Sequence, residues 1–169
     1  MKKLIIVMSL IVLTATVSAQ SAVDKVFNKY AGKDGYTTVV INKFMFQFLS
    51  NIETNDPDYE SFKNATSGIE SIRILTRDGN SSAAFGKELL EILPRKEYQE
   101  MMTVKESDEE VVFLVKEVGG EITEFLLVVS GSDEAVLIAI TGIIDMKSIS
   151  SLTSGLDLPA MESLKELDK

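Results

Sequence analysis

The sequence has no cysteine, no histidine and no tryptophan, and only three prolines in 169 residues. Without cysteine, disulfides, thiolate metal sites, thiol nucleophiles and a lipid-bearing N-terminal cysteine are all excluded, so we expect the protein not to be a lipoprotein. Without histidine, the chain lacks the commonest general base and the commonest transition-metal ligand. The remaining composition, 45% apolar and 25% charged, is that of a globular protein.

Basic residues are also scarce, since 17 lysines and arginines face 26 acids and the net charge is −9. A protein that binds nucleic acid needs a basic surface to displace phosphate counterions. After the first residues, no basic cluster is longer than Arg95-Lys96. The sequence therefore predicts no nucleic-acid partner, and repulsion from anionic membrane surfaces.

The N-terminal segment has the order of parts typical of a secretory signal peptide. Lys2 and Lys3 precede an apolar run over 4–13, and small residues then lead to Ala19. The run is shorter than the roughly 20 residues of a membrane span. We predict cleavage after Ala19, leaving one domain over 20–169 with net charge −11, since 15 basic and 26 acidic residues remain. The mature protein is expected to be soluble in the periplasm or outside the cell, without stable membrane insertion.

Hydrophobic periodicity and turn residues predict an α+β fold. Helices are expected from Ser21 to a stop at Gly32, from Asn42, over 56–67 and over 82–93, and again after Asp145 and after Pro159. Strands are expected over 36–41, 69–77, 102–106, 110–118, 121–129 and 135–141. The predicted sheet is mixed, with about six strands, and ends in a four-strand antiparallel meander because the last connections are short.

Several segments, taken in order, resemble one known family. They are 24–32, 112–116 with the Gly119-Gly120 turn, and 141–145. Together they resemble domain of unknown function 4252, a family of exported proteins from Gram-negative bacteria, over about 20–160. The resemblance implies an unassigned activity, so it carries over no catalytic or binding residue.

Two features are weak candidates for a ligand or interface site. Phe44, Met45, Phe48 and Leu49 share one helical face, which we expect to face the core, whereas Phe46 points away from it. Phe46 therefore either packs under a neighbouring helix or lines a ligand pocket or interface. The second feature is the acidic turn Asp108-Glu109-Glu110, which could grip a cation or a basic partner but is more simply a solvated hairpin tip.

Catalytic and cofactor motifs are missing from the sequence. It contains no G-x-S-x-G elbow and no P-loop. Asp56, Asp58 and Glu60 alternate as in a calcium loop, but Ser61 and Ser67 occupy the positions that need Gly and Glu. We therefore predict no cofactor, no metal and no enzyme activity.

The predicted function is a non-catalytic binding module whose partner is a protein of the cell envelope. One alternative is a carrier of a small apolar ligand. The other is a hydrolase of an envelope polymer, which would require two close carboxylates in a cleft, one of them with a raised pKa.

Overall fold

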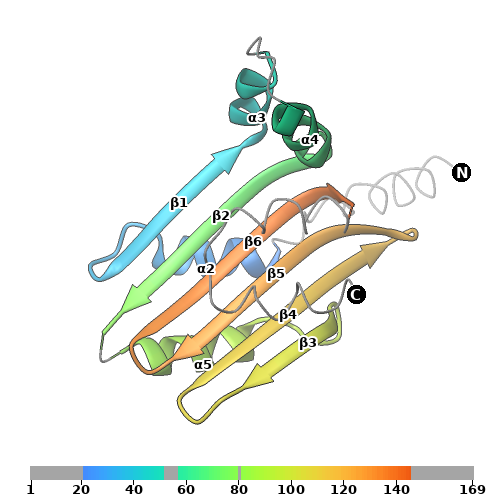
Figure 1. Cartoon of the computed structure of the whole chain (residues 1–169). Coiled ribbons are helices and arrows are strands. Elements are labelled where there is room, and N and C mark those ends of the chain that lie inside the picture. Colours follow the sequence, from blue (N-terminus) through green and yellow to red (C-terminus); the bar gives the residue numbers. More distant parts are fainter. Residues whose placement is uncertain (1–20, 52–56, 80, 146–169) are drawn as a thin grey trace, which may run out of the picture.

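The fold is an α+β arrangement in which helices pack against one antiparallel sheet, as given by a computed structural model that describes residues 21–51, 57–79 and 81–145 (Figure 1). The helices are α2 (Ala22–Tyr30), α3 (Lys43–Leu49), α4 (Pro57–Thr66) and α5 (Ser82–Ile92). The strands are β1 (Tyr36–Asn42), β2 (Ile69–Asp78), β3 (Gln99–Lys105), β4 (Glu109–Val118), β5 (Glu121–Gly131) and β6 (Glu134–Ile144). The predicted signal peptide, the start of the 56–67 helix and the helices after Asp145 lie outside the described residues.

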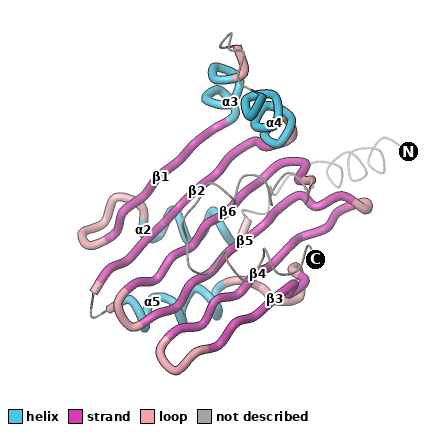
Figure 2. Tube along the Cα trace, in the orientation of Figure 1, coloured by secondary structure: helices cyan, strands magenta, loops and turns pink. Residues whose placement is uncertain are grey.

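The sheet has the strand order β1-β2-β6-β5-β4-β3, and every neighbouring pair is antiparallel. The α+β class, the six strands and the terminal meander β3–β6 are confirmed, but the sheet is not mixed. A parallel pair needs a connection that crosses a face of the sheet. The chain between β1 and β2 instead forms α3 and α4 at one end of those strands, so that it reverses direction (Figures 1 and 2).

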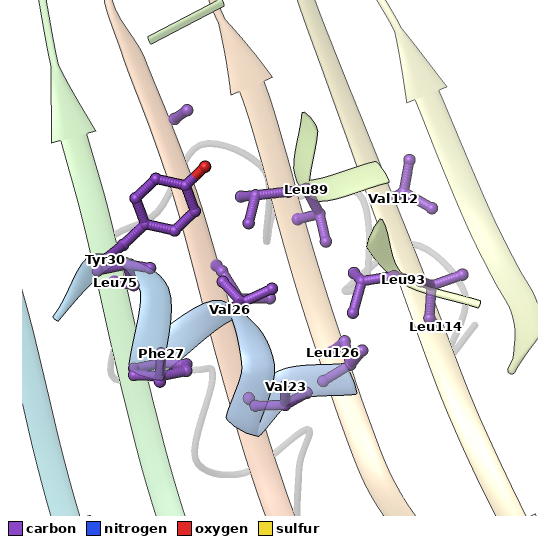
Figure 3. Packing of buried hydrophobic residues seen from close by; sticks show 14 of the residues in the cluster. Val23, Val26, Phe27, Tyr30, Leu75, Leu89, Leu93, Val112, Leu114 and Leu126 are labelled. Carbon is purple, nitrogen blue, oxygen red and sulfur yellow. The ribbon is translucent and has the colours of Figure 1, made fainter. Parts of the chain in front are cut away.

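One face of the sheet is covered by α2 and α5, and its apolar side chains form a single cluster (Figure 3). Ser21 caps α2 as predicted, since its hydroxyl accepts a hydrogen bond from the Asp24 N–H at 3.0 Å. The helical period then places Val23, Val26 and Phe27 on the buried side of α2, with Tyr30. The cluster includes Leu89 of α5 and Leu93 at the end of that helix, and it continues across the sheet through Leu75, Val112, Leu114, Leu126, Val128, Ala135, Leu137 and Ala139.

The opposite face carries a second apolar cluster, built largely from the sheet itself. The strand register aligns one apolar row across it, through Val39, Ile74, Ile138, Leu127, Phe113 and Met102. Among the described helices, α3 contributes Phe46 to this cluster and α4 contributes Phe62. Phe113 is only 1% exposed, so β4 is buried on this face as well.

Two strand boundaries differ from the prediction by three residues each. The last strand was expected to end at Thr141 and turn into a helix, but β6 continues to Ile144. Gly142 adopts φ +131 at an irregularity in the β2–β6 register, and the Ile143 N–H donates to the Gly68 carbonyl at 2.8 Å, so pairing resumes beyond the glycine. The third strand starts at Gln99 rather than Met102, because Gln99 and Glu100 already pair with β4.

Helix α5 packs so closely on β5 that it has room only for glycine at position 86. A Cβ added to Gly86 would lie 2.6 Å from the Ser130 Cα and 2.3 Å from its hydroxyl oxygen. Ser82 also holds α5 close to the end of β5. Its hydroxyl lies within hydrogen-bonding distance of two backbone carbonyl oxygens, that of Gly131 at 3.1 Å and that of Ser132 at 2.7 Å.

The substitution Gly86→Ala tests this close packing. In a free helix it would stabilise by about 0.5–1 kcal/mol. Here the clash with Ser130 should outweigh that gain, because overpacking costs about 1–3 kcal/mol. Thermal unfolding should show a lower Tm for Gly86→Ala and little change for Lys87→Ala, an exposed position of the same helix. A Gly86→Ala protein as stable as the original would contradict the close approach.

Candidate functional site

A polar cavity of about 480 Å³ opens where the start of α2 meets the sheet. Four strands and the helix contribute to its lining, which consists of Ser21, Asp24, Ser71, Arg73, Lys116, Thr123, Glu124 and Thr141. The order β2-β6-β5-β4 places these side chains together, although they are far apart in the sequence. The lining suits water or a polar molecule rather than an apolar ligand.

Arg73 is the central cation of the cavity. Its Nη1 lies 2.7 Å from Asp24 Oδ1, and its guanidinium carbon lies 4.9 Å from the centre of the Phe27 ring. The hydrogen bond from Arg73 holds the pKa of Asp24 below its ordinary value of 3.8, although partial burial acts in the opposite direction. Arg73 Nε is buried and has no hydrogen-bond partner in the described part of the chain.

Glu124 is the buried acid of the cavity, with 5% of its surface exposed. The Tyr98 hydroxyl donates to Glu124 Oε2 at 2.6 Å. Burial and this hydrogen bond to a carboxylate together raise the pKa of Tyr98 well above its usual range, so the phenol stays protonated as a donor. A buried carboxylate without a donor would be costly, and Tyr98 offsets that cost.

The cavity therefore contains two carboxylates, and each has a partner. The pKa of Asp24 is lowered by Arg73, and Glu124 accepts from Tyr98. A general acid that works near neutral pH needs a raised pKa, which is not found at Asp24.

The ion pair between Asp24 and Arg73 makes stability depend on pH. Because the folded protein lowers the Asp24 pKa, the pair contributes fully above pH 3.8 and is lost as the pH falls through the lower folded value. Asp24→Asn should reduce the free energy of unfolding at pH 7 by up to about 1 kcal/mol, since the Asp24 side chain is 42% exposed.

Urea unfolding at pH 7 and pH 3 measures this effect. The difference between Asp24→Asn and the original protein should be smaller at pH 3, because pH 3 lies below the ordinary Asp24 pKa of 3.8 and the contribution of the pair is then being lost. Asp133→Asn, an exposed acid in a turn, serves as control and should have little effect at either pH. A difference that stays constant with pH would contradict the role of the ion pair.

Helix α3 buries the opposite face from the one that the sequence analysis predicts. Phe46 is 7% exposed and packs in the second apolar cluster, whereas Phe44 and Phe48 are 78% and 68% exposed. Met45 is exposed beside them, and we call these three side chains the α3 apolar surface. Periodicity showed which residues share a face, but the expectation that this face is core was wrong.

Contacts at both ends of α3 fix its orientation. Asn42 caps the helix as predicted, its side-chain oxygen accepting from the Phe44 N–H at 3.1 Å. At the other end, the Tyr59 hydroxyl of α4 donates to the Leu49 carbonyl. The α3 apolar surface is thus held outward by a buried Phe46 and two hydrogen-bonded ends.

Phe46, the candidate site residue, also lines a smaller cavity of about 230 Å³. The cavity lies between α3 and α4 and the start of β2, with Lys43, Lys63 and Ile69 among its other lining residues. A role for Phe46 in binding stays a prediction. In the structure, the buried Phe46 side chain anchors α3 in the second apolar cluster.

The acidic candidate Asp108-Glu109-Glu110 lies at the turn between β3 and β4. Asp108 and Glu109 are exposed, and Glu110 Oε1 lies 3.0 Å from Lys105 Nζ. Across the described ranges, no group of three or more acids is placed so that it could hold a metal ion. A partner at this turn stays a prediction.

Sequence reasoning did not select Arg73 or Glu124. Arg73 lies between Ile72 and Ile74, and Glu124 directly precedes the apolar run that starts at Phe125. A charge beside apolar strand residues is the available indication that it has a buried partner. Their meeting in one cavity depends on the strand order, which no local pattern records.

Comparison with known proteins matches the chain to one family model. The model, described as a domain of unknown function (DUF4252), matches residues 30–152. A search of the curated proteins finds no match. Of the helices described, none has the length and apolar content needed to cross a bilayer.

Proposed function

The chain belongs to the DUF4252 family, and we propose that it is an exported, non-catalytic protein that binds another protein of the cell envelope through the α3 apolar surface. The observation that carries this proposal is the exposure of Phe44 and Phe48, one helical turn apart, with Met45 beside them. Exposed clusters of large apolar side chains mark interaction sites. Aromatic residues and methionine are also enriched in the centres of protein interfaces.

The fixed orientation of α3 supports a binding role. A buried Phe46, the Asn42 cap and the Tyr59 hydrogen bond hold Phe44 and Phe48 in water. The exposed side chains of two phenylalanines do not stabilise the isolated protein, because the hydrophobic effect stabilises a fold only through apolar surface that is removed from water. A partner would supply that burial.

Charge and composition favour a protein as the partner. The net charge of −9 disfavours the phosphates of nucleic acids and anionic lipids. Export is supported by Lys2, Lys3 and the apolar run that precedes Ala19.

A photo-crosslinking amino acid introduced in living host cells tests the proposal. Placed at position 44 or 48, it should give the same single adduct with one envelope protein, identified by mass spectrometry. The matched control is position 118, because Val118 is also exposed but lies at the end of β4, which β2, β6 and β5 separate from β1. The mass of the recovered protein should also show Gln20 as its first residue.

The double variant Phe44→Ser/Phe48→Ser separates binding from stability. Because both side chains are exposed, each substitution should change the free energy of unfolding by less than about 0.5 kcal/mol. With a crosslinker at position 45, the adduct should be lost in this variant. Equal adducts at positions 44, 48 and 118, or none at any of them, would contradict the proposal.

A further inference from the structure

The two edges of the sheet are built differently. Edge strands expose unpaired backbone groups, and proteins usually protect them with charges, prolines or bulges. The edge strand β3 has such protection, since it carries Glu100 and Lys105 and its register shifts between Glu100 and Met102. The edge strand β1, with the sequence YTTVVIN, has no charge and no proline, and pairs with β2 in unbroken register over all seven residues.

Both faces of the sheet are open at β1. Val39 is 42% exposed and Val40 is 58% exposed, and neighbouring residues of a strand point to opposite faces. Val39 also continues the apolar row that runs through Ile74 and Ile138. A further strand beside β1 would extend that row and bury both valines.

We propose that β1 pairs in antiparallel fashion with β1 of a second copy of this chain, joining two six-stranded sheets into one. This property is separate from the proposed function and uses different residues. A twofold axis at Val39 places Val39 opposite Val39 of the second copy and Thr38 opposite its Val40. Every residue of β1 then faces an uncharged residue of the other β1. Such a self-complementary contact is the ordinary form of a homodimer interface.

Charge favours a second copy at this place. An acidic protein resists self-association, but β1 carries no charge of its own. Lys43 directly follows β1 and Asp34 lies two residues before it, so antiparallel pairing of two β1 strands brings the end that carries Lys43 towards the end of the second copy that carries Asp34. Both side chains are exposed, and in the described part of the chain neither forms an ion pair. Two complementary contacts would therefore flank the joined strands.

Disulfide trapping tests the register directly, because the chain contains no cysteine. Directly opposite residues of an antiparallel pair have Cα atoms about 4.5–5.5 Å apart, within the range of a disulfide. Purified Val39→Cys protein should therefore form a covalent dimer under mild oxidation. Met101→Cys, exposed on the other edge strand, should stay mostly monomeric.

Charge exchange at the same position tests the contact without a covalent bond. Like charges directly opposite weaken strand pairing, so Val39→Lys and Val39→Glu alone should each raise the dimer dissociation constant about tenfold or more. An equal mixture of the two should recover the dimer in sedimentation equilibrium. Met101→Lys should leave it intact, and circular dichroism checks that every variant is folded.

A protein that sediments as a monomer up to about 200 µM, a concentration at which mass action would populate even a weak dimer, overturns the inference. So does a dimer that Met101→Lys abolishes and Val39→Lys does not. Neither result bears on the proposed partner, because a single crosslink from position 48 to a different protein would still be expected. Conversely, the absence of an adduct at positions 44 and 48 would contradict the proposed envelope partner and leave the β1 dimer unaffected.

Discussion

The rest of the structure depends on the burial of apolar side chains on both faces of the central strands. In β4 and β5, consecutive residues such as Leu126 and Leu127 point to opposite faces and both are buried. A strand of this kind needs cover on each face to keep its apolar side chains out of water. On one face α2 and α5 provide the cover, and Gly86 brings α5 close to β5.

The burial of both faces explains why charged residues on the central strands need partners from other elements. Arg73 and Glu124 lie on apolar strands, and each has a partner from outside its strand: Asp24 of α2 and Tyr98 before β3. The resulting cavity is polar, and its acids are engaged by a cation or a donor. The ion pair between Asp24 and Arg73 holds the start of α2 against the sheet.

Much of the fold was predictable because it is encoded locally. The Ser21 cap, the Gly119-Gly120 turn with positive φ at both residues, and the short links of the meander are contained in a few neighbouring residues each. The orientation of α3 was not predictable, because the spacing of Phe44, Phe46 and Phe48 is the same whichever side faces the core. The candidate surface is therefore a tertiary property, as is the meeting of Arg73 and Glu124.

The central claim is that this protein binds another protein of the cell envelope through the α3 apolar surface. Amide hydrogen exchange on the purified protein, alone and mixed with its host's envelope extract, tests the claim most directly. The account predicts that the extract adds protection at α3, Lys43–Leu49, and none at the edge strand β3, Gln99–Lys105. Added protection elsewhere, or none at all, would contradict it.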